Sequence, residues 1–303
     1  MTIMTDFQRK MTALLPHIKL LTNESLAKHT SFRIGGPAEV MAFPKTAEEL
    51  GELLKQSALL DVKPAILGAG TNILAPDEGV PGLVICLKEC MDILEKTDET
   101  HIRVGTGVSM ARAAVFAANC GLSGLEFAHG IPGSVGGGVY MNAGAYGGEI
   151  CQVCEAVEVM DTDGEIHNLT ASEMDFSYRH SRLERDGGIV LSAAFALTPK
   201  NTTEIRATMQ DLMTRRRASQ PLNLPSAGSA FKRPVGGYAT ALIDQTGLKG
   251  YRVGDAAVSE KHAGFAVNLG SATANDVKKL LNDVSEKVFE NTGIRLEPEV
   301  RIW

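Results

Sequence analysis

Two short stretches of the 303-residue chain carry side chains whose types and spacing could do acid–base chemistry. Arg179 lies beside Tyr178 in "FSYRHS", where a surface cation and an interface aromatic are by themselves a sufficient interpretation. Ser229 is followed by Lys232 in "PSAGSAFKRPVGGYA". A serine can donate a proton when a neighbouring cation lowers the cost of its alkoxide. No G-x-S-x-G motif surrounds this serine, so the sequence gives little support for a hydrolase nucleophile. The pattern favours a proton donor over a covalent nucleophile.

A third stretch, "IRLEPEVRIW", alternates like a strand at the C-terminus. The alternation predicts one apolar face and one polar face, so two carboxylates share a side. The apolar face holds Leu296, Val300 and Ile302, and the polar face holds Glu297, Glu299 and Arg301. Loop cations gather in the same third of an otherwise acidic chain, and they suit an anionic small-molecule substrate such as a diphosphate. They are Lys232, Arg233, Lys249, Arg252 and Lys261.

Glycine-rich turns recur before residue 150 and indicate a bound anion. "LGAGTN" (67–72) and "GTG" (105–107) each follow an apolar strand, and "GIPGSVGGGVYMNAGA" covers 130–145. None completes G-x-G-x-x-G at a helix start, and the chain has no Gly-Lys dipeptide, so a Rossmann fingerprint and a P-loop are both absent. Because glycine has no Cβ, its backbone N–H groups can approach a phosphate closely. The turns together favour a large phosphate-bearing cofactor.

The elements that must position these residues follow from hydrophobic periodicity. A helix begins after Thr46 with Leu50, Leu53 and Leu54 on one face, and Asp163-Gly164 marks a hairpin. A second helix follows "GTG", with Val115, Ala118 and Cys120 as expected core positions. A third carries Ile205, Met209, Leu212 and Met213 and leads to a domain boundary near residue 220. A last helix runs from about Asn275 to Gly293, with Val277, Leu280, Leu281, Val284 and Val288 apolar.

Composition excludes several classes of protein. A net charge of -6 and a pI near 5.7 argue against non-specific binding to nucleic acid or to an anionic membrane. No signal peptide and no apolar run of transmembrane length is present, so we expect a cytoplasmic protein. Cys151 and Cys154 form "CQVC", but a strand-like run follows and no second cysteine pair completes a zinc site. We interpret these thiols as small buried hydrophobes.

The motifs quoted above, with "HTSFRIGGPAE" and "GLKGYRVGDAAVSEKHAGFAVN", resemble those of the UDP-N-acetylenolpyruvoylglucosamine reductase (MurB) family in order and spacing. The resemblance covers roughly residues 24–302. It implies an α+β fold, with a two-part FAD-binding region of the vanillyl-alcohol-oxidase (PCMH) type and a C-terminal α+β substrate-binding domain. We expect FAD-binding subdomains at 1–90 and 91–218 and the substrate-binding domain at 219–303.

The resemblance also implies an activity. NADPH would reduce non-covalently bound FAD, and the flavin would pass hydride to UDP-N-acetylglucosamine enolpyruvate, giving UDP-N-acetylmuramate for peptidoglycan. Ser229 would protonate the substrate carbon next to the carboxylate, with Arg179 and Glu299 at the enol end. A guanidinium there stabilises the charge that develops on the carboxylate. Glu299 would be protonated or share a proton network, and Glu297 is the reserve candidate.

Binding residues follow from the same resemblance. The expected FAD contacts are Arg33, Gly68, Ala69, Gly70, Thr71, Asn72, Gly130, Ile131, Pro132, Gly133, Ser134, Val135, Gly136, Gly137, Asn142, Ala143, Gly144 and Ala145, within a wall that extends to Gly138. The expected substrate contacts are Tyr178, Lys232, Arg233 and Tyr238. The chain lacks room for the extra tyrosine loop and so resembles the family's second class. Thr240 and Ala241 depart from the expected pattern and leave a diphosphate contact there open. We expect a monomer without metal, nucleic-acid or membrane partners.

Two other functions are compatible with part of the sequence. An oxidase of alcohols or sugars with the same FAD fold would share the glycine pattern of the first two hundred residues, but it would lack "GSAFKRP" and "LEPEVR". A nucleotide-sugar binding protein without turnover would have no need of Ser229, Arg179 and Glu299 together. The motifs favour the reductase over both.

Overall fold

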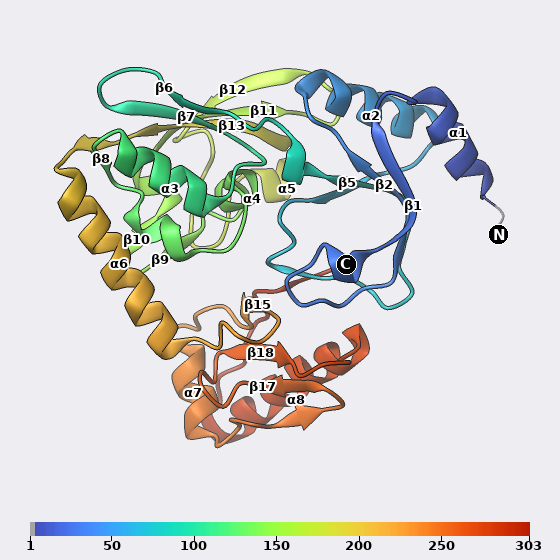
Figure 1. Cartoon of the computed structure of the whole chain (residues 1–303). Coiled ribbons are helices and arrows are strands. Elements are labelled where there is room, and N and C mark those ends of the chain that lie inside the picture. The colour runs from blue at the N-terminus through green and yellow to red at the C-terminus, as the bar shows by residue number, and fades with distance from the viewer. Residues whose placement is uncertain (1–3) are drawn as a thin grey trace. The chain divides into compact units, whose positions relative to one another are not determined.

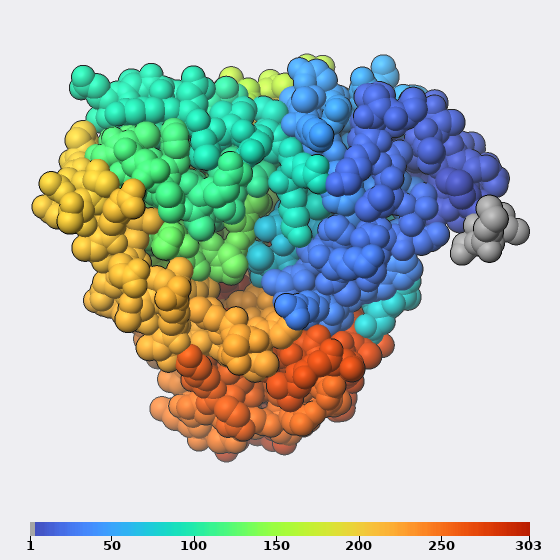
Figure 2. All heavy atoms as spheres, viewed as in Figure 1, coloured from blue at the N-terminus to red at the C-terminus, as the bar shows by residue number. Residues whose placement is uncertain are grey.

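The computed structural model describes residues 4–303 and is α+β throughout. The chain packs into two compact units, each of which is discontinuous in sequence. The first unit holds the chain up to Thr22, Glu39–Ala69 and Gly82–Arg215, and the second holds Asn23–Ala38, Gly70–Pro81 and Arg216–Trp303. Figure 1 labels their helices and strands, and Figure 2 shows the surface with residues 220–303 in orange and red.

A four-stranded sheet begins the chain, in the order β1 (Lys19–Ser25), β2 (Pro37–Phe43), β5 (Val80–Cys86) and β3 (Ala65–Leu67). Helix α1 (Asp6–Leu14) precedes β1 in the chain, and α2 (Ala47–Leu59) connects β2 to β3. The Thr46 side chain accepts a hydrogen bond from the Glu49 N–H and starts α2, as the sequence predicts. Leu50, Leu53 and Leu54 are buried in one core, which confirms the predicted apolar face of this helix.

A five-stranded antiparallel sheet forms the rest of the first unit. Its order is β12 (Ile166–Thr170), β11 (Cys154–Met160), β13 (Ile189–Ala196), β7 (His101–Gly105) and β6 (Leu94–Lys96). The Asp163-Gly164 hairpin joins β11 to β12, and Gly164 has a φ of 87° that favours glycine. Figure 1 shows α3 (Met110–Asn119) and α4 (Val135–Tyr140) beneath this sheet. Shorter elements are β8 (Leu122–Ser123), η3 (Glu126–Gly130), β9 (Gly144–Ala145), β10 (Gly148–Glu149), α5 (Leu183–Asp186) and β14 (Thr198–Pro199).

The buried face of α3 differs from the one predicted. Val115 is 40% exposed and Cys120 is only partly buried, whereas Ala118 is buried as expected. The core positions are alanines at helical spacing, which are Ala113, Ala114, Ala117 and Ala118. Alanine lets the helix approach its neighbours closely, so the larger Val115 lies on the solvent side.

Helix α6 (Thr202–Ser219) follows the predicted apolar stripe only at its start. Ile205 and Met209 are buried, but Leu212 and Met213 are half-buried. No helix in the described residues 4–303 is long and apolar enough to cross a membrane.

The second unit contains a four-stranded antiparallel sheet, in the order β15 (Ser226–Ser229), β18 (Phe265–Asn268), β17 (Ala256–Val258) and β16 (Arg252–Val253). Helices α7 (Ala239–Gln245) and α8 (Ala274–Thr292) belong to the same unit. Helix α8 starts in a capping box of Thr273 and Asp276 and ends at Gly293, whose φ is 73°. Its predicted apolar positions are all buried: Val277, Leu280, Leu281, Val284 and Val288.

Residues from the first third of the chain complete this second unit. Phe32, Ile34 and Leu74 share one hydrophobic core with α8. The Asp77 carboxylate accepts hydrogen bonds from the N–H groups of Ala274 (2.7 Å) and Asn275 (3.1 Å), which begin α8. The segment around Asp77 is therefore fixed to a helix almost two hundred residues later in the chain.

The C-terminal strand is shorter than its alternation predicts. Only β19 (Arg301–Ile302) is a strand, and it pairs in parallel with β4 (Ile73–Leu74). Leu296 and Val300 are buried as expected, but Ile302 is 46% exposed. Because residues 296–300 do not form a continuous strand, the period of two does not extend from Leu296 to Ile302.

Candidate active site

The glycine-rich segment of the first unit is fixed against the chain that follows β7. The Val135 N–H donates to the Val108 carbonyl (2.8 Å), and the Gly136 N–H donates to the Thr106 carbonyl (3.1 Å). The Ser134 hydroxyl accepts from the Gly137 N–H (3.4 Å) and starts the short helix α4. These bonds hold the backbone of the predicted cofactor-binding turn in one conformation.

The glycines of α4 have two different surroundings. A Cβ placed on Gly136 would overlap the Thr106 hydroxyl, and one on Gly138 would lie 2.7 Å from the Met110 sulfur. A Cβ on Gly137 would meet only the Ser134 hydroxyl, at 3.5 Å, and Gly137 is exposed. Packing inside the unit therefore requires Gly136, a Cβ on Gly138 would require the Met110 side chain to shift, and Gly137 leaves an open face on the helix.

Asn142 connects this segment to the loop that carries Arg179. Its side chain is 1% exposed, and its φ of 41° lies in the left-handed region that asparagine tolerates. The side-chain amide donates to the Ser177 carbonyl (2.9 Å), and the side-chain oxygen accepts from the Cys151 N–H (2.9 Å). One buried amide thus fixes the chain at Cys151 and also at Ser177, which lies 35 residues after Asn142.

Tyr178 and Arg179 form the tip of a tight turn. The N–H of Ser177 donates to the carbonyl of His180 (3.1 Å), and the reverse bond measures 3.2 Å. Arg179 has a φ of 55°, and its guanidinium donates to the Gly144 carbonyl (3.0 Å) and lies 4.9 Å from the centre of the Tyr178 ring. A left-handed backbone at a non-glycine residue costs roughly 1–2 kcal/mol. The surrounding bonds hold Arg179 in this conformation.

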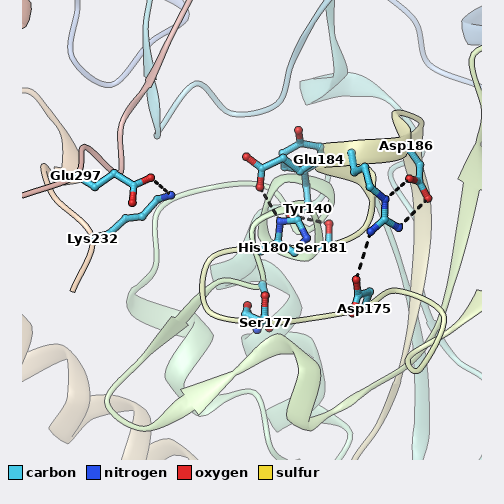
Figure 3. A network of polar contacts seen from close by, with 11 residues as sticks. Tyr140, Asp175, Ser177, His180, Ser181, Glu184, Asp186, Lys232 and Glu297 are labelled. Carbon is cyan, nitrogen blue, oxygen red and sulfur yellow. Dashed lines mark hydrogen bonds and ion pairs between the residues drawn. The ribbon is translucent and has the colours of Figure 1, made fainter. Parts of the chain in front are cut away.

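Two further contacts secure the base of the turn. The buried Ser181 hydroxyl donates to the Tyr140 carbonyl at the end of α4 (2.7 Å), and His180 Nδ1 lies 2.8 Å from a Glu184 carboxylate oxygen (Figure 3). Arg179 is thus positioned by α4, by the Gly144 carbonyl and by Asn142. The sequence alone pointed to these glycines and to this arginine separately, and no local pattern indicated that they meet.

The first unit offers features that fit a bound FAD. Gly137 presents backbone with no side chain on an open face, and Pro132 at the preceding turn is exposed. His129 Nδ1, directly before Gly130, is buried and has no hydrogen-bond partner among residues 4–303. A buried polar atom without a partner is costly unless a ligand or water satisfies it. The residues present therefore suit a polar, phosphate-bearing group.

In the second unit, Ser229 ends β15 at an irregularity of the sheet. The register with β18 shifts between Ser226 and Ser229, and Gly228 has a φ of 79°. Such bulges are common beside active sites because they redirect a side chain. Ser229 is exposed, and the next residue, Ala230, donates its N–H to the Gly264 carbonyl (2.8 Å).

The segments that carry Ser229 and Glu299 are antiparallel neighbours. The Glu299 N–H donates to the Ala230 carbonyl (2.9 Å), and the Lys232 N–H donates to the Glu297 carbonyl (2.9 Å). An isolated bridge between Phe231 and Pro298 lies between these bonds. Ala230, which follows the predicted proton donor Ser229, thus accepts a hydrogen bond from the backbone of Glu299.

Predicted substrate contacts in this unit have partners of their own. Lys232 Nζ lies 2.6 Å from a carboxylate oxygen of Glu297 (Figure 3), with the two side chains 39% and 70% exposed. The Arg233 guanidinium lies 4.7 Å from the centre of the Tyr238 ring. Tyr238 is 62% exposed and precedes α7. Glu297, the reserve candidate for catalysis, thus neutralises a cation that the resemblance assigns to substrate.

The predicted FAD contacts of the second unit lie near a point where the backbone at Gly70 closely approaches the backbone at His29 and Ser31. Gly70 accepts the N–H of Ser31 through its carbonyl (2.9 Å), and a Cβ on Gly70 would overlap the His29 carbonyl. Arg33 is exposed with a φ of 56°. The Asn72 side-chain amide donates to the Glu299 carbonyl (3.1 Å), a contact that sequence reasoning missed because nothing local signals it.

The predicted residues divide between the units. The first unit contains Gly68, Ala69, Gly130, Ile131, Pro132, Gly133, Ser134, Val135, Gly136, Gly137, Asn142, Ala143, Gly144, Ala145, Tyr178 and Arg179. The second unit contains Arg33, Gly70, Thr71, Asn72, Ser229, Lys232, Arg233, Tyr238 and Glu299.

Of the two cysteines of "CQVC", Cys154 is buried in the hydrophobic core as predicted, whereas Cys151 is only half-buried. Burial raises the pKa of the Cys154 thiol to about 12, and burial also raises the pKa of the Cys151 thiol. Both are free thiols, and Cys154 lies at the start of β11, which confirms the predicted strand. A thiol with a raised pKa is a poor nucleophile near neutral pH.

Comparisons with known proteins agree with this geometry. The family described as "UDP-N-acetylenolpyruvoylglucosamine reductase, C-terminal domain" matches residues 220–303, and "FAD binding domain" matches 38–170. A UDP-N-acetylenolpyruvoylglucosamine reductase of Agathobacter rectalis is 48% identical over 98% of both chains. One of Levilactobacillus brevis is 46% identical over 95% of this chain and 94% of its own. The chain belongs to the UDP-N-acetylenolpyruvoylglucosamine reductase family.

A solved structure of the same family extends the agreement to the fold. The UDP-N-acetylenolpyruvylglucosamine reductase (MurB) from Thermus caldophilus superposes with a TM-score of 0.79 at 38% identity, over 95% of this chain and 99% of that one. The chain is therefore an FAD-dependent oxidoreductase. Its α+β fold combines an FAD-binding domain with the C-terminal domain of this family, as the motifs predicted.

Proposed function

We propose that this enzyme uses NADPH and FAD to reduce UDP-N-acetylglucosamine enolpyruvate to UDP-N-acetylmuramate, a cytoplasmic step of peptidoglycan precursor synthesis. The names of the curated relatives support the substrate class. The observation that carries the proposal is the antiparallel pairing of the Ser229 and Glu299 segments, through the bond from the Glu299 N–H to the Ala230 carbonyl. A proton donor and a carboxylate on two paired segments of backbone suit protonation of a single substrate carbon.

FAD, once reduced by NADPH, supplies the hydride. In the first unit the turn at Gly130–Gly133, Ser134 and the open face of Gly137 would hold it, with Asn142 to Ala145 beyond. In the second unit Arg33 and the backbone of residues 70–72 would contribute. Gly136 and Gly138 support this binding indirectly, because they let α4 pack against Thr106 and Met110.

Residues of the chain stabilise the negative charge that develops on the substrate and supply the proton that the substrate carbon takes up. When hydride adds to the terminal carbon of the enolpyruvyl group, an electron pair moves toward the carboxylate and makes an enolate-like species. The Arg179 guanidinium stabilises that charge more in the transition state than in the ground state. Ser229 then donates its hydroxyl proton to the carbon next to the carboxylate, and the positive charge of Lys232 lowers the cost of the resulting alkoxide.

Glu299 completes the set at the enol end, protonated or within a shared proton network, because an ionised carboxylate would repel the developing charge. Tyr178, Lys232, Arg233 and Tyr238 contact the nucleotide sugar.

The FAD-binding subdomains correspond to 1–90 and 91–218, and the substrate-binding domain corresponds to 219–303. The enzyme works as a monomer without nucleic-acid or membrane partners.

The test follows the flavin through its two half-reactions. Purified protein should be yellow, NADPH should bleach it, and the enolpyruvyl nucleotide sugar should restore the colour. Ser229→Ala should leave bleaching near normal and slow recolouring by about 100-fold or more, in the range typical of general acid–base catalysis. A colourless protein that cannot be reconstituted with FAD would contradict the proposal, and equal slowing of both half-reactions would exclude Ser229 as the proton donor.

A further inference from the structure

The backbone of Glu299 is held from two sides by chain segments of the second unit. On one side its N–H donates to the Ala230 carbonyl (2.9 Å). On the other side its carbonyl accepts a hydrogen bond from the side-chain amide of Asn72 (3.1 Å). Asn72 also accepts, through its own carbonyl, the N–H of Arg301 (3.1 Å). A single asparagine therefore contacts the chain at Glu299 and again two residues later.

These contacts matter because the chain is irregular there. Strand β19 begins only at Arg301, and the residue before Glu299 is Pro298, which has no N–H to donate. The bridge between Phe231 and Pro298 and its flanking bonds fix the residues directly before Glu299, and the Leu296 carbonyl accepts a hydrogen bond from the Ser285 hydroxyl (2.9 Å). Removing the Asn72 amide would leave the half-buried Glu299 carbonyl without this donor, so the peptide that carries the carboxylate could rotate.

We propose that Asn72 is a positioning residue for Glu299, which it aligns through the backbone carbonyl. The inference rests on the proposed role of Glu299 in catalysis. It differs from the role that the glycine turn suggests, because a cofactor contact at Asn72 would govern FAD affinity, whereas a positioning role governs the rate at which bound, reduced flavin is reoxidised by substrate.

The first experiment separates these two roles with Asn72→Ala. We expect the flavin content, the flavin absorption spectrum and the rate of bleaching by NADPH to stay within about twofold, and reoxidation by the enolpyruvyl nucleotide sugar to slow about 10-fold or more. Asn291→Asp and Asn291→Ala serve as matched controls, since the Asn291 amide donates to the Lys287 carbonyl (2.8 Å) on an exposed part of α8. A protein that loses FAD but reoxidises normally per bound flavin would overturn the inference.

Asn72→Asp adds a signature that a general loss of structure would not produce. This variant keeps the size of the side chain but replaces the N–H donor with an oxygen that repels the Glu299 carbonyl. As the pH falls and the carboxyl takes up a proton, a donor returns. The ratio of its reoxidation rate to that of the unaltered enzyme should therefore rise toward low pH. A ratio that does not change with pH would contradict the proposed action of Asn72 through the Glu299 carbonyl.

The closing experiment is a double-mutant cycle of Asn72→Ala with Glu299→Gln. If Asn72 acts through Glu299, its slowing of reoxidation should fall to less than about twofold in the Glu299→Gln background. The same slowing in both backgrounds would overturn the inference and leave the role of Glu299 standing. A Glu299→Gln variant that reoxidises like the unaltered enzyme would instead contradict the proposed role of Glu299, and the positioning role with it.

Discussion

The Asn142 side-chain amide donates a hydrogen bond of 2.9 Å to the carbonyl of Ser177, and through it the glycine-rich segment supports the turn that presents Arg179. Asn142 and Arg179 both have backbones in the left-handed region. The strain is local, and the bonds that hold it come from distant parts of the sequence. The guanidinium of Arg179 is therefore preorganised within the first unit.

Asn142→Ala should loosen this turn. The Cys151 N–H would lose its acceptor, while the Ser177 carbonyl would keep the His180 N–H (3.2 Å). One unsatisfied buried group costs about 1–3 kcal/mol of the free energy of unfolding. We expect a lower urea midpoint and slower reoxidation by substrate. Both changes should be larger than those in Asn291→Ala, because Asn291 is exposed. An unchanged urea midpoint would mean that the buried Asn142 amide contributes nothing to the stability of this turn.

The glycines of α4 provide a matched pair of substitutions. Gly137→Ala adds a methyl group on the open face, so the unfolding free energy should change by less than about 1 kcal/mol while FAD affinity falls. Gly136→Ala places the same methyl group against the Thr106 hydroxyl, so it should destabilise the apoprotein by about 1–3 kcal/mol. Thermal unfolding without FAD and flavin titration measure the two effects. Equal FAD affinity in Gly137→Ala and the unaltered protein would place the flavin away from this face.

The ion pair of Lys232 with Glu297 predicts opposite effects for two neighbouring glutamates. Glu297→Gln frees Lys232 for the anionic substrate, so KM should fall by about twofold at low salt, a size typical of exposed pairs. Glu299→Gln should lower kcat by about 100-fold, because it alters a group at the reacting end. Steady-state kinetics at two ionic strengths measures both. If Glu297→Gln abolished reoxidation and Glu299→Gln did not, the two assignments would have to be exchanged.

The exposed pair of Asp98 and His101 predicts a pH dependence of stability. The Thr100 N–H and the His101 ring lower the pKa of Asp98 to about 2, and the Asp98 carboxylate raises the pKa of His101. The contribution of Asp98 is present above about pH 4 and is lost as pH falls toward about 2. That of His101 is present below about pH 6.5 and is lost as pH rises through its raised value.

Both contributions therefore coincide near pH 5. Asp98→Asn should lower the urea midpoint most at pH 5 and less at pH 8 or pH 2. Asp92→Asn is the control, since Asp92 pairs with Arg112 (2.7 Å), which stays charged from pH 5 to 8. If Asp98→Asn lowered the urea midpoint by the same amount at every pH, the charge of His101 would not contribute to the effect of Asp98 on stability.

Much of the local structure was predictable from the sequence. The capping residues Thr46 and Gly293 and the apolar spacing of α8 act within a few residues, so the pattern alone identified those helices. The hairpin at Asp163-Gly164 is local in the same sense. Val115 and Ile302 were assigned to the wrong environment, because the packing of α3 and the short length of β19 depend on chain that lies elsewhere in the sequence.

The sequence by itself determined the family, the helices and the residues that the motifs mark, since these depend on residue type and short-range spacing. The tertiary structure decided how those residues are supported. It placed Asn142 against Ser177, paired the segments of Ser229 and Glu299, and brought Asn72 and Asp77 into the unit that contains α8. Such contacts join residues far apart in the chain, and they form because buried carbonyl and N–H groups must find partners wherever the fold brings them.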